Sequence, residues 1–111
     1  MSITITYTDE FKRNLRQLLK KYVRIREDIE PIIQVLQQGE LLGDRIQQGA
    51  YIVYKVRVKN SNVQKGKSGG YRIIYYLKTQ TDIVLLTIYS KSEQSDITAN
   101  EIKRIIKQLT N

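Results

Sequence analysis

The sequence predicts a single α+β domain in which helices cover a mostly antiparallel sheet. The first observation is length, because 111 residues are about what one compact domain requires. The second is a change in apolar spacing, from a helical period before residue 39 to alternation after residue 51. The third is that helical patterns flank the main run of strands. This order favours a fold of two layers, in which the helices cover one side of a sheet.

The first 39 residues are predicted to form a short strand and a helical hairpin. Residues 2–7 alternate polar and apolar side chains, as a half-buried strand does. Thr8 then begins a helix that runs to about residue 21 with one apolar stripe. A second stripe over residues 29–36 predicts a second helix, with Pro31 tolerated in its first turn.

The remainder is predicted to be a sheet closed by a last helix. Residues 39–50 read as an irregular connection, and residues 60–70 as a polar, glycine-rich loop. Three strands, at about residues 51–59, 71–78 and 83–89, form an antiparallel meander. Thr98 and Glu101 have the spacing of a capping box at the start of the terminal helix.

The composition excludes several kinds of chemistry. The chain contains no cysteine and no histidine, so it offers no disulfide, thiolate metal ligand, cysteine nucleophile or imidazole base. It shows no apolar stretch of about 18 residues and no signal-peptide pattern, which makes the cytoplasm the expected location and a membrane an unexpected partner.

Positive charge is concentrated in the predicted sheet. The chain carries a formal charge of +8, and the stretch from Lys55 to Lys91 holds eight cationic side chains against the single acid Asp82. Alternation puts Lys55, Arg57 and Lys59 on one face, about 6 to 7 Å apart, a spacing similar to that of successive phosphates. These cations could instead solvate an exposed sheet face. Their number favours an anionic polymer as the partner.

Three segments resemble a known family of bacterial proteins. They are residues 54–58, Tyr-Lys-Val-Arg-Val, residues 65–76, in which a basic glycine-rich loop leads into Tyr-Arg-Ile-Ile-Tyr-Tyr, and residues 85–93, Leu-Leu-Thr-Ile-Tyr-Ser-Lys-Ser-Glu. Together they are similar to the RelE/ParE superfamily of toxins, nearest to its RelE and HigB-like branch. The order of elements also fits a RelE-like fold, so residues 1–111 are expected to be a single RelE-like toxin domain.

The resemblance implies a toxin of a type II toxin–antitoxin system. Such a toxin would be an endoribonuclease, or mRNA interferase, that cleaves messenger RNA on the ribosome and inhibits translation. Its implied partners are a cognate antitoxin, messenger RNA and the ribosome, with no cofactor. The scarcity of acids in the basic stretch also argues against a metal. Attack by the neighbouring 2′-OH needs a proton acceptor, cations around the phosphorane and a proton donor for the leaving oxygen.

Basic residues on the central strands carry catalysis in the RelE-like members that the chain resembles. We expect Lys55 to be the base, because neighbouring cations favour the neutral form of a lysine. Arg57 and Arg72 would hold the phosphate, and Lys91 would protonate the leaving group. Glu93 is an alternative base. Contacts to RNA, including stacking by the tyrosine, are expected from Lys59, Lys65, Lys67 and Tyr89.

Other functions remain open at the level of sequence. A ParE-like inhibitor of DNA gyrase would cut nothing, and it would not need basic side chains that converge on a phosphate. A non-catalytic RNA-binding module would show the same salt dependence as a nuclease but would leave message intact. An inactive copy of a toxin is a third alternative. The clustered cations favour the nuclease.

Overall fold

The computed structural model describes residues 3–63 and 69–109 and contains, in these ranges, a five-stranded sheet and three helices. The strand order is β1-β5-β4-β3-β2, with β1 parallel to β5 and the other neighbours antiparallel. The predicted α+β class and mostly antiparallel sheet are therefore confirmed. In chain order the elements are β1 (Thr4–Tyr7), α1 (Asp9–Lys21), α2 (Ile25–Gln37), β2 (Asp44–Ile46), β3 (Val53–Val58), β4 (Tyr71–Thr79), β5 (Asp82–Ser90) and α3 (Ala99–Leu109).

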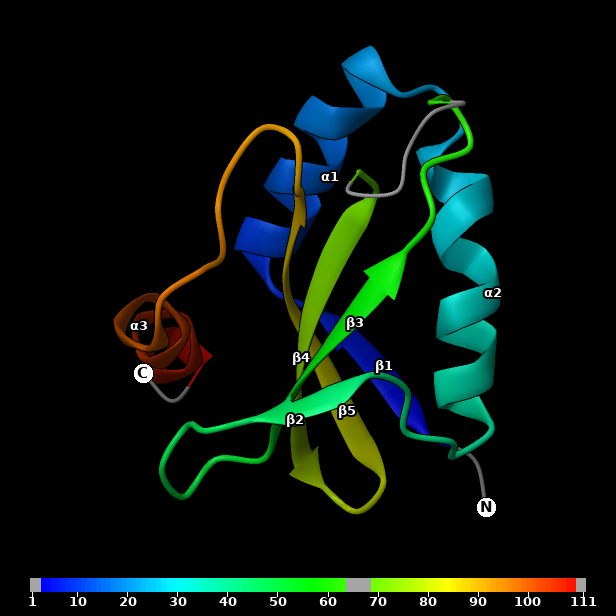
Figure 1. The fold of residues 1–111 in the computed structure, drawn as a ribbon. Coiled ribbons are helices and arrows are strands. Elements are labelled where there is room, and N and C mark those ends of the chain that lie inside the picture. The colour runs from blue at the N-terminus through cyan, green and yellow to red at the C-terminus, as the bar shows by residue number, and fades with distance from the viewer. Residues whose placement is uncertain (1–2, 64–68, 110–111) are drawn as a thin grey trace.

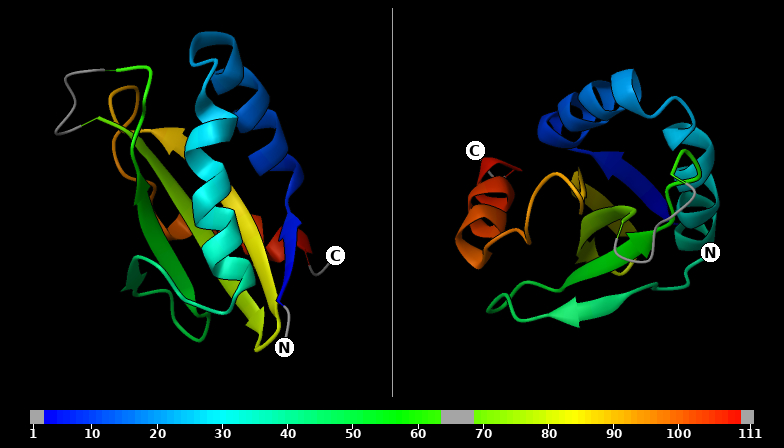
Figure 2. Two further views of the ribbon diagram at one scale, coloured as in Figure 1. Left: turned by 90° about the vertical axis from the view of Figure 1, so that its right-hand side faces the viewer. Right: turned by 45° about the horizontal axis from the view of Figure 1, so that its top comes forward.

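Helices cover both faces of the sheet (Figures 1 and 2). On one face, α1 and α2 pack with residues such as Phe11 and Ile29 against Ile73 of β4. On the other, α3 packs with Ile102 and its neighbours against Ile74 of β4. The predicted two-layer arrangement is therefore wrong. Because the central strands are apolar on both faces, each face has to be covered by a helix.

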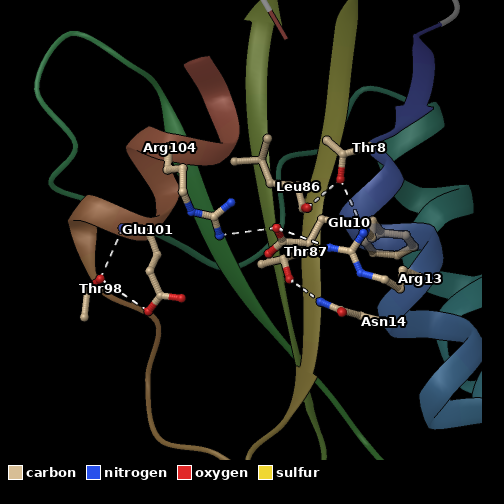
Figure 3. A network of polar contacts seen from close by, with 10 residues as sticks. Thr8, Glu10, Arg13, Asn14, Leu86, Thr87, Thr98, Glu101 and Arg104 are labelled. Atoms are coloured by element: carbon tan, nitrogen blue, oxygen red, sulfur yellow. Dashed lines mark hydrogen bonds and ion pairs between the residues drawn. The ribbon is translucent and has the colours of Figure 1, made fainter. Parts of the chain in front are cut away.

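Thr8 joins the start of α1 to β5 (Figure 3). Its hydroxyl accepts a hydrogen bond from the backbone N–H of Phe11 at 2.9 Å and donates one to the carbonyl of Leu86 at 2.7 Å. About one helical turn after Phe11, the Asn14 side-chain amide donates a hydrogen bond to the Thr87 hydroxyl at 2.9 Å. The predicted cap is confirmed, and it also fixes the helix along β5 beyond the point where β1 ends.

An ion pair connects the helices on the two faces. Glu10 of α1 lies 3.3 Å from Arg104 of α3 and 3.8 Å from Arg13 of its own helix (Figure 3). At the start of α3, the backbone N–H of Glu101 donates to the Thr98 hydroxyl at 3.2 Å. The predicted cap of the terminal helix is thus confirmed.

The second helix begins earlier than its sequence pattern predicts. α2 starts at Ile25, so Pro31 lies in its second turn and the expectation of a first-turn proline is wrong. Ile25 and Ile29 are both buried. Their burial lengthens the apolar stripe and offsets the backbone hydrogen bond that proline cannot make.

The segment at residues 39–50 was predicted to be an irregular connection, and this is wrong in part, because Asp44–Ile46 forms β2. This strand pairs with β3 and places Asp44 opposite Lys55. It is too short for a period of two to be visible in sequence. Gly43 enters it with φ +89°, and a Cβ there would collide with the backbone carbonyl of Lys55.

None of the helices in residues 3–63 and 69–109 has the length and apolar character needed to span a lipid bilayer.

Candidate active site

The candidate site is built on two neighbouring strands. In the register of β3 and β4, Arg57 lies opposite Arg72, and residues opposite each other in an antiparallel pair point to the same face. Val56 and Val58 pack toward α1 and α2, so alternation directs Lys55 and Arg57 to the α3 face. The predicted grouping of Lys55, Arg57 and Arg72 is therefore present in the fold.

A hollow of about 180 Å³ lies over this part of the sheet. Four cations and two acids line it, and they come from β2, β3, β4 and the segment between β5 and α3. The lining residues are Asp44, Lys55, Arg57, Arg72, Lys91 and Asp96. We call this set the cationic hollow. Four cations within one small concavity form a site with which an anionic group would interact favourably.

The two arginines of the hollow differ in how firmly they are held. Arg72 is only 8% exposed, and its Nη1 donates to the carbonyl of Tyr71 at 3.2 Å and to that of Gly69 at 3.5 Å. Arg57 is exposed. The buried, fixed guanidinium of Arg72 and the exposed guanidinium of Arg57 opposite it could both contact a phosphate, because each presents its donors in a planar, forked geometry.

The match to known proteins covers nearly the same length as the fold. Residues 9–111 match the model of the family described as the RelE toxin of the RelE / RelB toxin–antitoxin system. The chain belongs to the RelE toxin family. The predicted resemblance is thus confirmed, and membership makes the chain a toxin whose partner is an antitoxin.

Asp96 is, with Asp44, one of two residues lining this RelE-family toxin's hollow to which the sequence assigned no role. Its Oδ1 accepts a hydrogen bond from Lys91 Nζ at 2.9 Å and lies 3.6 Å from Lys55 Nζ. The hydrogen bond from Lys91, and then the charge of Lys55, lower the pKa of the Asp96 carboxyl below its usual value. No local pattern marked this aspartate, because it lies in a segment without helix or strand periodicity.

The hollow is also less free of acids than the sequence suggested. Only Asp82 interrupts the basic stretch, yet Asp44 and Asp96 line the hollow from outside that stretch. Within the described residues, no group of three or more histidine, cysteine, aspartate or glutamate side chains is placed to hold a metal ion.

Tyr89 is buried, whereas a tyrosine that stacks on an RNA base has to be exposed. Its side chain is 4% exposed and belongs to the apolar cluster beneath α3. Its hydroxyl donates to Asp96 Oδ1 at 3.4 Å, and burial, followed by the Asp96 charge, raises the tyrosine's pKa. The ring is therefore enclosed, and Tyr89 is linked to the hollow by the hydrogen bond from its hydroxyl to the lining residue Asp96.

A β-bulge explains why Tyr89 faces α3. The register of β4 and β5 shifts between Ile74, which pairs with Thr87, and Tyr75, which pairs with Leu85. One extra residue reverses the alternation beyond it. Ile88 consequently packs toward α1 and α2, and Tyr89 lies opposite Arg72 on the α3 face.

The structure does not bring Glu93 into the cationic hollow. Its carboxylate accepts a hydrogen bond from the Tyr22 hydroxyl at 2.7 Å and lies 3.0 Å from Lys21 Nζ. The hydrogen bond from Tyr22, and then that from Lys21, lower the pKa of Glu93. Glu93 lines a separate hollow beside α1.

Of the other basic residues predicted to contact RNA, only Lys59 belongs to the described residues. Lys59 is exposed just beyond the end of β3 and does not line the cationic hollow. Lys65 and Lys67 lie outside the described residues.

Proposed function

We propose that this toxin is a metal-independent endoribonuclease that cleaves messenger RNA by attack of the 2′-OH on the adjacent phosphate, and thereby inhibits translation. The observation that carries the proposal is the placement of Lys55, Arg57, Arg72 and Lys91 around one hollow. Such convergence suits a phosphorane, whose added charge needs positive groups on several sides. Because these residues come from β3, β4 and the segment after β5, their convergence depends on the whole sheet.

The proposed roles follow from position. Arg72, fixed by its backbone contacts, and Arg57, directly opposite, bind the non-bridging oxygens of the scissile phosphate. Lys55 accepts the proton of the 2′-OH, and Lys91 gives a proton to the leaving 5′-oxygen. Glu93 lies among Tyr22 and Lys21, so its alternative role as base receives no support from the geometry.

The ribosome and the antitoxin complete the proposal. We place cleavage in the ribosomal decoding site, where messenger RNA would enter the hollow with its backbone fixed. Lys59, Lys65 and Lys67 supply contacts to neighbouring phosphates. The cognate antitoxin is expected to contact the basic toxin through an acidic segment.

Cleavage of messenger RNA on purified ribosomes tests the proposal. Lys55→Ala and Arg57→Ala should each slow cleavage by about 10²-fold or more. Lys78→Ala, which removes an exposed cation of β4 outside the hollow, should leave it within about twofold. The upstream product should end in a 2′,3′-cyclic phosphate and the downstream product in a 5′-hydroxyl. Intact message with wild-type toxin, or full activity in both hollow variants, would overturn the assignment.

A further inference from the structure

A carboxylate oxygen of the hollow lies close to both of its lysines. Asp96 Oδ1 is 2.9 Å from Lys91 Nζ, 3.6 Å from Lys55 Nζ and 3.4 Å from the Tyr89 hydroxyl. Three donors thus converge on a single anionic oxygen. This is the arrangement that an oxygen of a bound phosphate would be expected to take among the same groups.

We propose that Asp96 is a positioning residue: its carboxylate holds Lys55 and Lys91 together in the empty hollow and is displaced from them by an incoming phosphate. The inference rests on the phosphate-binding role proposed above for the cationic hollow. The Asp96 carboxylate thus acts as an internal anion that competes with the substrate for Lys55 and Lys91.

Exposure of the group makes displacement feasible. The side chain of Asp96 is 56% exposed, and those of Lys55 and Lys91 are 29% and 30% exposed. Ion pairs at this level of exposure contribute little net stability, because water solvates the separated charges well. A phosphate also offers acceptor oxygens to the arginines of the hollow, and it can therefore replace the carboxylate at small cost.

The backbone keeps the displaced carboxylate close to the hollow. Ile97, the next residue, packs against the apolar cluster beneath α3, and the backbone N–H groups of Glu93 and Gln94 both donate to the Ser90 carbonyl. Asp96 is thus fixed on either side. Its carboxylate can release the lysines by side-chain rotation and bind them again after the product leaves.

Asp44 provides a matched control within the same hollow. It contributes an equal charge, but no other residue that lines the hollow forms an ion pair with it. Asp44→Asn and Asp96→Asn therefore remove the same charge from the same concavity. Only the second change removes the group that contacts Lys55 and Lys91.

Inorganic phosphate is the probe for the experiment. Side-chain NMR signals of Lys55 and Lys91, assigned with Lys→Arg variants, are followed as phosphate is added to the intact toxin. Asp96→Asn should bind phosphate about three- to tenfold more tightly than wild type, because one competing anion is gone. Asp96→Glu should restore the wild-type affinity, and Asp44→Asn should tighten binding by less than about twofold.

Three results would overturn the inference. They are unchanged or weaker phosphate binding in Asp96→Asn, an equal gain in Asp44→Asn, and wild-type lysine signals that do not respond to phosphate at all. A merely structural aspartate would weaken binding when replaced, whereas a displaced one strengthens it. Cleavage is scored separately: a toxin that binds phosphate as expected but leaves message intact disproves the nuclease and not the role of Asp96.

Discussion

Arg57 on β3 and Arg72 on β4 are direct cross-strand partners, with both side chains lining the cationic hollow. Like charges directly opposite each other in a sheet destabilise it. The fold accepts this pair at the place where a phosphate would be bound. The arrangement is that of a site in which stability is lowered in favour of ligand binding.

Neutralising the exposed member of this pair should therefore make the protein more stable. Arg57→Gln is expected to raise the free energy of unfolding by about 0.2–1 kcal/mol, because repulsion from Arg72 is removed. Urea denaturation measures the change, and Lys78→Gln is the control for loss of one exposed charge. A lower stability in Arg57→Gln than in Lys78→Gln would show that the two guanidinium groups do not repel each other in the fold.

The two threonine caps should differ in their contribution to stability. Thr8 is buried, and its hydroxyl bonds both Phe11 N–H and the Leu86 carbonyl. Thr98 is exposed and caps α3 alone. We expect Thr8→Ala to cost about 2 kcal/mol and Thr98→Ala about 0.5–1 kcal/mol. Thermal unfolding gives both values, and Thr8→Ser should recover most of the loss. Equal costs for the two alanine variants would contradict this account.

The contact between Glu93 and Tyr22 predicts a dependence of stability on acid. The pKa of Glu93 is lowered from 4.5, first by the hydrogen bond from Tyr22. A carboxylate with a lowered folded-state pKa contributes stability that is complete above pH 4.5 and is lost as pH falls through the folded-state pKa. The effect is small, because Glu93 is largely exposed to solvent.

NMR titration of the Glu93 carboxyl carbon tests the cause of that shift. Tyr22→Phe removes the hydroxyl but keeps the ring, so the pKa of Glu93 should move up toward 4.5. The matched variant Tyr54→Phe removes a tyrosine hydroxyl elsewhere on the same face of the sheet and should leave the Glu93 titration as in wild type. An unchanged midpoint in Tyr22→Phe would assign the shift to Lys21 instead.

Gly43 should be far more sensitive to substitution than Gly49. Both have positive φ, +89° and +63°, so alanine is strained at either position. At Gly49 a Cβ meets nothing within 4 Å, whereas at Gly43 it meets the backbone of Lys55 and Val56. We expect Gly49→Ala to cost about 1 kcal/mol and Gly43→Ala about 3 kcal/mol. Gly43→Ala should also slow cleavage, because β2 must move away from Lys55. Similar stabilities for the two variants would rule out the close approach.

Local sequence determined most of the elements and part of the site. The caps at Thr8 and Thr98, the helical stripes and the alternation along β3 each depend on neighbours a few residues away, and such patterns constrain the backbone directly. Alternation alone was enough to place Lys55 and Arg57 on one face. It did not reveal β2, which has three residues, or the start of α2 at Ile25.

Tertiary structure decided the rest. A bulge in β5 turned Tyr89 toward α3, and the non-periodic segment after β5 brought Lys91 and Asp96 to the hollow while Glu93 went to Tyr22. α3 covered the second face because that face is apolar across several strands. Each outcome depends on contacts between residues distant in sequence, and the free energy of such contacts is not encoded in the pattern of any one segment.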